Sequence, residues 1–178
     1  MTVFFTADTH FGHARIIDFM ARPFRDLEDM DRSLIDRWNA RVAPDDTVYH
    51  LGDFAWGSAR AAAAVLAALN GRKTLIAGNH DHSRTRALDG WEQVTQILEV
   101  EHGGVRLALC HYPMLEWPGA WKGVLHLFGH VHGRIPALDR RCDVGVDVWD
   151  FAPVTLPEIQ ARLASAPAYT PTDAHAAA

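Results

Sequence analysis

Side chains that bind metal ions follow five short apolar runs in this chain. Each run is bounded by glycine or polar residues and has the length of a buried strand, so the residues that follow are expected to gather along one edge of a sheet. The groups are carboxylate, imidazole and amide without thiolate, which suits manganese, iron, zinc, cobalt or nickel and argues against a structural zinc site of cysteines. The segments are Asp8-Thr9-His10, Gly52-Asp53, Gly78-Asn79-His80-Asp81, His111-Tyr112-Pro113 and Gly129-His130-Val131-His132-Gly133.

In this order, the five segments resemble the motifs of the calcineurin-like metallophosphoesterase superfamily, over most of the chain from Asp8 to Gly133. One such segment alone is a weak signal, because Asp-x-His or Gly-Asn-His-Asp also occurs as an ordinary polar turn. All five in order, each after a strand-like run, argue against coincidence. The resemblance implies a small single-domain phosphoesterase of the prokaryotic type.

The family pattern, carried over position by position, implies two neighbouring divalent metal ions, with manganese favoured and iron, zinc, cobalt or nickel as alternatives. Asp53 corresponds to the carboxylate that bridges both ions, because a bridge needs two anionic oxygens, which imidazole lacks. Two such ions hold a bridging hydroxide that attacks phosphorus, so no serine or cysteine nucleophile is required. The implied ligands are Asp8, His10 and His132 for one ion and Asn79, His111 and His130 for the other.

His80 resembles the family's catalytic histidine, which donates a proton to the leaving-group oxygen or stabilises its developing charge. Many members carry a second aspartate three residues after the bridging one, directed at this histidine, but this chain has Trp56 there. Another group must therefore orient His80, either a backbone carbonyl or Asp81, and protonated His80 is less favoured without the carboxylate. The alternative for Asp81 is that it caps the following turn.

Three residues near the ligands are candidates for substrate binding. His13 and Arg15 lie a few positions after His10, within reach of a phosphate group. Trp117 follows His111 and is a candidate for stacking on a base or an aryl leaving group. The ordinary alternatives are that His13 caps a helix, that Arg15 is solvated and that Trp117 pins its loop to the core.

The elements that must position these residues alternate between strand and helix. Helices are expected over 14–21, 26–41 and 59–69, the last one capped by Ser58, and a short one after Pro157. Runs 94–100 and 105–110 flank a glycine turn and predict a hairpin, which adds antiparallel pairing. The pattern alone indicates an α/β protein. The resemblance implies a two-sheet mixed β sandwich flanked by helices, with the metals at strand ends.

Composition favours one compact domain, because 178 residues with 48% hydrophobic residues suffice for a sizeable core. We expect a metallophosphoesterase domain over 1–165 and a disordered tail over 166–178, which is rich in alanine and proline. Met1 and Thr2 lead directly into a strand, without a signal peptide, and no stretch reaches membrane-spanning length. We therefore expect a cytoplasmic protein with no membrane partner.

The net charge constrains the substrate. The 17 Lys and Arg against 22 Asp and Glu give −5, so no broad basic surface is expected and a large nucleic acid is disfavoured. Two bound cations still make the site attractive to a small anion. The prediction is a dinuclear phosphoesterase acting on a small phosphodiester or phosphomonoester, with an open site that favours diesters. The alternatives are a nuclease for short or single-stranded nucleic acid and a non-catalytic protein-binding scaffold of the same fold.

Overall fold

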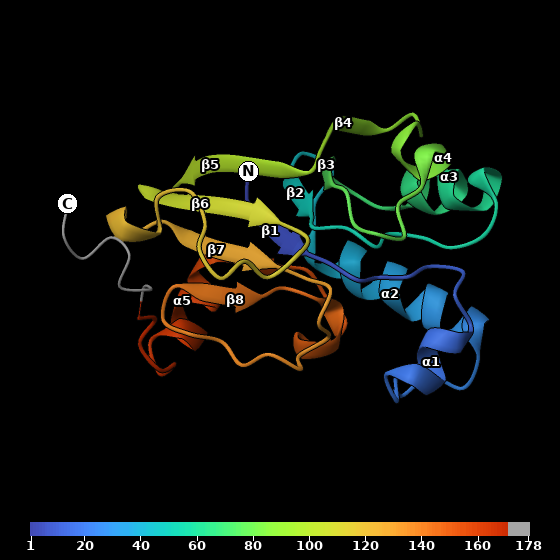
Figure 1. The fold of residues 1–178 in the computed structure, drawn as a ribbon. Coiled ribbons are helices and arrows are strands. Elements are labelled where there is room, and N and C mark those ends of the chain that lie inside the picture. Colours follow the sequence, from blue (N-terminus) through green and yellow to red (C-terminus); the bar gives the residue numbers. More distant parts are fainter. Residues whose placement is uncertain (171–178) are drawn as a thin grey trace.

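Two β-sheets face each other, and helices flank them (Figure 1). The structure is a computed structural model that describes residues 1–170. The first sheet has the order β4-β3-β2-β1-β9, with β1 to β4 parallel and β9 antiparallel to β1. Its strands are β1 (Val3–Thr6), β2 (Thr47–His50), β3 (Arg72–Ile76), β4 (Trp91–Thr95) and β9 (Val154–Thr155).

The second sheet has the order β5-β6-β7-β8, in which β5 is antiparallel to β6 and the other pairs are parallel. This mixture of parallel and antiparallel pairs in both sheets confirms the expected fold class. The strands are β5 (Ile97–His102), β6 (Val105–Cys110), β7 (Leu125–Phe128) and β8 (Arg141–Asp143). The helices are α1 (Arg15–Phe19), α2 (Leu27–Arg41), α3 (Ala59–Ala68), α4 (Ser83–Arg86), α5 (Leu156–Leu163) and the 3-10 turns η1 (Ala120–Lys122) and η2 (Val146–Val148).

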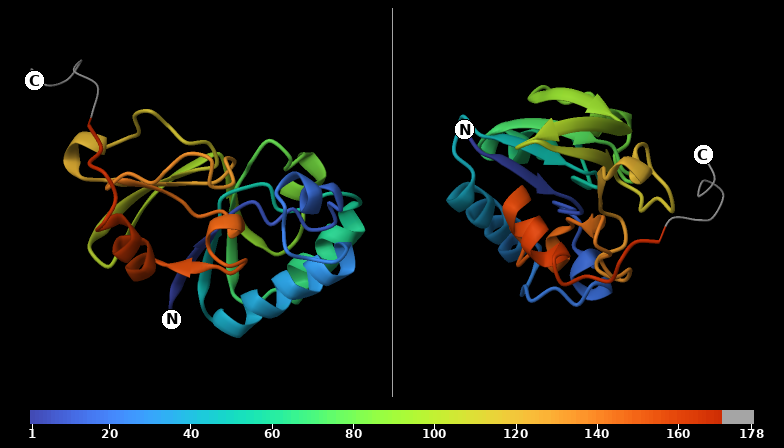
Figure 2. Two further views of the ribbon diagram at one scale, coloured as in Figure 1. Left: turned by 90° about the horizontal axis from the view of Figure 1, so that it is seen from below. Right: turned by 90° about the vertical axis from the view of Figure 1, so that its left-hand side faces the viewer.

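Strand alternation divides the interior into two layers. Phe4 in β1 packs with α2 and α3 on one face of the first sheet, whereas its neighbour Phe5 packs between the sheets. Figure 2 shows α2 and α3 on the side of the first sheet that faces away from the second. From α2, Met30, Leu34 and Trp38 enter the outer layer at the four-residue spacing of one helix face.

The predicted helices are present, with ends shifted by one or two residues. Ser58 caps α3 as expected, because its hydroxyl accepts a hydrogen bond of 3.2 Å from the backbone N–H of Ala61. α5 begins with a reciprocal capping box between Thr155 and Glu158. No helix of residues 1–170 combines the length and the apolar composition that crossing a bilayer requires.

The expected strand 94–100 is divided between the two sheets. β4 ends at Thr95 and β5 begins at Ile97, so the chain passes from one sheet to the other at Gln96. The hairpin of β5 and β6 is as predicted, with its turn at Gly103 and Gly104. A continuous apolar run does not reveal such a crossing, because both halves keep the character of a strand.

Residues 166–170, which the sequence analysis assigned to a tail, lie against the domain. The Tyr169 hydroxyl donates a hydrogen bond of 2.9 Å to the carbonyl of Leu115, and its ring centroid is 4.6 Å from that of Trp117. The backbone N–H of Tyr169 donates to the carboxylate of Asp139. Residues 171–178, the rest of the expected tail, lie outside the described residues.

Candidate metal centre

The seven expected ligands follow strands of both sheets and come together in space. Asp8, Asp53 and Asn79 follow β1, β2 and β3 in the first sheet, and His111 and His130 follow β6 and β7 in the second. Because these five strands are joined by parallel pairing within each sheet, their carboxyl ends lie on the same side. The candidate metal centre therefore lies at the sheet ends, where the fold class places it.

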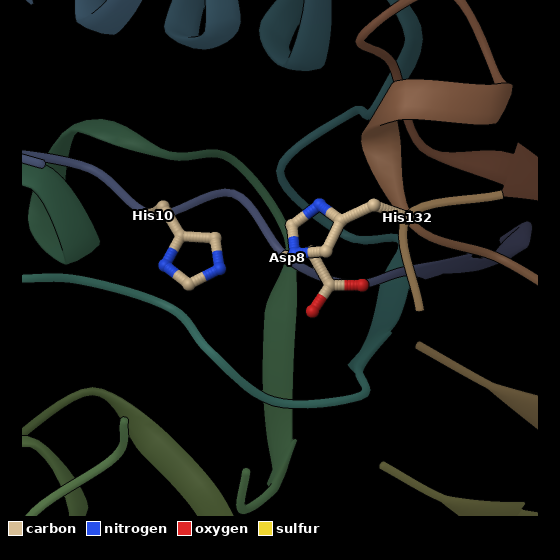
Figure 3. A group of neighbouring side chains, drawn as sticks. All are labelled: Asp8, His10 and His132. Atoms are coloured by element: carbon tan, nitrogen blue, oxygen red, sulfur yellow. The ribbon is translucent and has the colours of Figure 1, made fainter. Parts of the chain in front are cut away.

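The first ligand group consists of Asp8, His10 and His132 (Figure 3). One potential ligand atom from each lies within 4.8 Å of the others. Asp8 and His10 are buried, and the rings of His10 and His132 are stacked with centroids 5.4 Å apart. Gly129 and Gly145 leave room for the Asp8 carboxylate, because a Cβ on either glycine would lie 2.7 Å from Oδ2 of Asp8.

The second ligand group consists of Asp53, His111 and His130, again with potential ligand atoms within 4.8 Å of one another. Asn79 joins it, because its Oδ1 lies 3.0 Å from Nε2 of His111. The Nδ1–H of His111 donates a hydrogen bond of 2.7 Å to the Leu51 carbonyl, which leaves Nε2 as the nitrogen available for a ligand bond. Oδ1 of Asn79 and Nε2 of His111 are therefore two acceptors that face each other, and a cation between them stabilises this arrangement.

Asp53 lies between the two groups. Its Oδ2 is 3.6 Å from Nε2 of His10, and its Oδ1 is 3.5 Å from Nε2 of His111. The backbone N–H of His80 donates a hydrogen bond of 2.8 Å to Oδ1 and fixes the carboxylate. One oxygen of Asp53 thus faces each group, which is the arrangement that a bridging ligand needs.

The residues of this centre fit divalent cations on their own chemistry. Nε2 of His10 is buried and has no hydrogen-bond partner among the described residues. Burial, followed by the nearby His132, lowers the pKa of His10, so its ring is neutral and can donate a lone pair. Burial, together with Asp143 and Asp53, raises the pKa of Asp8, a crowding of carboxylates that a bound cation relieves.

Arg22 and Asp147 support the first group, and the sequence analysis missed both. Asp147 accepts a hydrogen bond of 2.7 Å from Nδ1 of His132, which leaves Nε2 of that ring free as a ligand. The buried Arg22 donates to Asp147 and to the backbone carbonyls of Asp8 and Thr9. Burial raises the pKa of Asp147, but the hydrogen bonds from His132 and Arg22 outweigh it and lower that pKa overall.

Asp81 has a different role from both that we considered. Its buried carboxylate accepts hydrogen bonds from the backbone N–H groups of Asp53, Phe54 and Gly78, at 2.8 to 3.0 Å. The hypothesis that Asp81 orients His80 is therefore wrong. The three hydrogen bonds go to residues that precede Asp81, so they do not cap the following turn either. Asp81 instead joins the loops after β2 and β3, which carry Asp53 and Asn79.

His80 lies beside the two groups and is held mainly by aromatic rings. Its Nε2 is 3.9 Å from Oδ2 of Asp53, and its side chain is 37% exposed. The ring centroids of His10 and Trp56 lie 5.4 and 5.5 Å away, both edge-on, and that of His13 lies 6.5 Å away. Within residues 1–170 no carboxylate lies within hydrogen-bond distance of its imidazole. The contacts that position the His80 imidazole are therefore mainly with aromatic rings.

The three candidates for substrate binding have separate positions. His13 is stacked on Trp56, with centroids 4.8 Å apart, and borders His80. Arg15 is exposed and lies over the ring of Phe19 at 4.8 Å. Trp117 is buried, and its indole N–H donates to the Val124 carbonyl. The expectation that Trp117 stacks on substrate is wrong, since packing against the loop leaves its faces inaccessible.

The backbone at this centre is unusual. Left-handed φ angles between 48° and 71° occur at most of the expected ligands. For a residue with a Cβ this conformation costs roughly 1 kcal/mol or more, so the surrounding contacts must impose it. The left-handed ligand residues are Asp8, His10, Asp53, His130 and His132.

Comparison with known proteins gives the family. The chain belongs to the calcineurin-like phosphoesterase superfamily, whose domain model matches residues 1–144. It is 32% identical over 164 residues to the uncharacterized protein MJ1445 of Methanocaldococcus jannaschii, covering 86% of each chain. This family and the two ligand groups support a metal-dependent phosphoesterase.

Solved structures agree with the fold. A protein of unknown function from Aquifex aeolicus, AQ665, is 26% identical with a TM-score of 0.73, covering 90% of this chain and 98% of that one. An archaeal phosphodiesterase is 20% identical with a TM-score of 0.50, covering 82% of each chain. At 20% identity, the similarity to the archaeal phosphodiesterase concerns the fold alone.

Proposed function

We propose that this protein hydrolyses small phosphodiesters with two divalent transition-metal ions, one at each ligand group. The observation that carries the proposal is Asp53, whose two oxygens face His10 and His111 at 3.6 and 3.5 Å. When bound, such ions lower the pKa of water and neutralise charge on the phosphate oxygens. Manganese is our first choice, because the donors are carboxylate, imidazole and amide, with iron, zinc, cobalt and nickel as alternatives.

The chain's own residues have distinct tasks in this proposal. Asp8, His10 and His132 hold one ion, and Asp147 keeps the His132 ring in the tautomer that can bind. In the other group, the Leu51 carbonyl does the same for His111. The residues proposed for the second ion are Asn79, His111 and His130, with Asp53 shared by both.

We assign the proton transfer to His80. Water supplies the oxygen that forms the new bond to phosphorus, the bond to the leaving oxygen breaks, and Nε2 of His80 donates a proton to that oxygen. His80 suits this task because it adjoins Asp53 without belonging to either group, and because its partly exposed ring can exchange its proton with solvent.

Access to the centre favours a diester. No segment between the elements of residues 1–170 is long enough to form a covering domain. The two ester arms of a diester can therefore leave the centre on opposite sides. The net charge of −5 continues to argue against a large nucleic acid, so the proposed substrate is small.

Metal content and turnover of Asp53→Asn test the proposal. The manganese-loaded wild type is expected to contain two ions per chain and to hydrolyse bis(p-nitrophenyl) phosphate at least as fast as p-nitrophenyl phosphate. Asp53→Asn should lose at least one ion and nearly all turnover, whereas Asp36→Asn, an exposed carboxylate on α2, should change neither. Two ions in an active Asp53→Asn variant would refute the bridge. Two ions without turnover in the wild type would favour the scaffold alternative.

A further inference from the structure

A cavity of about 220 Å³ adjoins the second ligand group. It forms where the chain passes from β4 to β5, at Gln96, so both sheets contribute to its walls. The residues that matter for its chemistry are Asn79, Arg86, Gln96, Ile97, Cys110 and Tyr112.

The cavity shares its wall with the metal centre. Asn79 lines it and also lies 3.0 Å from the ligand nitrogen of His111. The ring centroid of Tyr112 is 5.0 Å from that of His111 and 4.9 Å from that of His130. A group attached to a phosphate at the centre can therefore reach this cavity through a single ester linkage.

Part of the wall is formed by apolar and aromatic side chains. Tyr112 and Ile97 are 45% and 50% exposed, so their faces are available to a ligand. Cys110 is buried at the cavity and adds a small apolar side chain to its wall. An exposed aromatic ring beside an aliphatic side chain provides a stacking surface for a planar ligand.

Hydrogen-bonding groups at the rim are free. Arg86 uses Nε to donate to the Asp81 carbonyl, and its other guanidinium donors have no partner among residues 1–170. The Gln96 amide, also exposed, has no hydrogen bond to another described side chain or to the described backbone. Free donors and an amide beside the exposed Tyr112 ring and Ile97 side chain match the polar edge and the planar face of a nucleobase.

We infer that this cavity is a subsite for the nucleobase of a nucleotide or nucleoside phosphodiester. The inference rests on the proposed phosphoesterase function, and it specifies the substrate class of that site. The volume is below the roughly 300–1,000 Å³ of a pocket for a whole ligand, so the cavity takes one arm of the ester and leaves the phosphate at the metal centre.

Calorimetry with the manganese-loaded protein tests the subsite by binding alone. AMP is expected to bind at least about tenfold more tightly than ribose 5-phosphate, because stacking of one base contributes on this scale. Ile97→Trp should fill the cavity and remove this preference, while binding of inorganic phosphate stays unchanged. Val94→Trp is the matched control, since Val94 is also on a strand surface, 37% exposed, and does not line the cavity.

Adenosine, which has no phosphate, separates this inference from the proposed function. Saturation-transfer NMR should detect adenosine on the wild type and on Val94→Trp, and a much weaker signal on Ile97→Trp. Equal affinities for AMP and ribose 5-phosphate, or adenosine binding that survives Ile97→Trp, would overturn the subsite. Hydrolysis of methyl p-nitrophenyl phosphate reports on the metal centre alone, so its failure would count against the proposed function and not against the cavity.

Discussion

His13 and Trp56 are stacked with an interplanar angle of 17° and centroids 4.8 Å apart, and the rings of Trp56 and His80 are arranged edge to face with an interplanar angle of 62°. A large aromatic residue thus stands three positions after Asp53, where the family pattern of the sequence analysis led us to expect a carboxylate. An indole cannot accept a hydrogen bond from an imidazole, so it restricts the position of His80 by packing alone.

Removal of this ring should therefore loosen His80 without removing metal. We expect Trp56→Ala to lower kcat on an alkyl phosphodiester by about tenfold or more at unchanged metal content, because the proton donor is misplaced. Trp56→Phe keeps a ring and should retain most of the activity. Steady-state kinetics with elemental analysis checks this. A rise in KM alone would instead indicate that Trp56 contacts the substrate.

The buried pair of Arg22 and Asp147 should set the metal affinity of the first group. Asp147→Asn removes the charge that orients His132 and leaves Arg22 unpaired, so we expect about 10–100-fold weaker binding of one metal ion. Asp150→Asn is the control, because Asp150 also pairs with an arginine but is 93% exposed. Competition with a chelating dye measures the affinity, and equal affinities for the two variants would contradict this role.

His80→Ala should separate catalysis from metal binding. If His80 donates a proton, the variant keeps both ions and loses about 10²–10⁴-fold in turnover of an alkyl ester. The loss should be much smaller for a nitrophenyl ester, since nitrophenolate leaves readily without a proton. Equal losses on the two esters would show that His80 orients groups by hydrogen bonding. Loss of an ion would show that it supports the ligands.

His126 gives the metal-free fold a defined pH dependence. Burial lowers the pKa of His126 to about 4, and the ring is neutral, accepting a hydrogen bond from the N–H of Met114 and donating to the Ala108 carbonyl. The unfolded chain binds a proton at His126 near pH 6.5, whereas the folded chain does so only near pH 4. The contribution of His126 to the free energy of unfolding is therefore complete above pH 6.5 and is lost as pH falls towards 4.

His126→Gln isolates this contribution. Between pH 6.5 and 4, the free energy of unfolding of the wild type should decrease more steeply than that of the variant, by about 1.4 kcal/mol per pH unit. The raised pKa of Asp8 acts in the opposite direction, but it is common to both proteins and cancels in the difference. Urea unfolding with chelator present measures the slopes, and parallel slopes would contradict the prediction.

Sequence reasoning grouped the expected ligands because most of them follow an apolar run that ends in a polar residue. The structure divides these runs between two sheets and not along one, and the ligand-bearing ends of both sheets meet at the candidate metal centre. Sequence reasoning missed Arg22 and Asp147, since their contact spans 125 positions and neither lies in a motif. The only local signal was a pair of acidic residues, Asp143 at the end of β8 and Asp147 four positions later. The prediction that Trp117 stacks on substrate was wrong because the sequence of a Pro/Gly loop does not indicate which aromatic ring faces the core.

The left-handed backbone at residues such as Asp8 and His132 has a consequence for mutational scanning. In a helix or strand, glycine is usually more damaging than alanine, because it loses more conformational entropy on folding. At these positions alanine retains the left-handed strain of roughly 1–2 kcal/mol, and glycine removes it. In metal-free protein, His132→Gly should therefore unfold at a higher temperature than His132→Ala. A stability scan of the apoprotein would then show the metal loops as a cluster of positions where the usual order of the two residues is reversed.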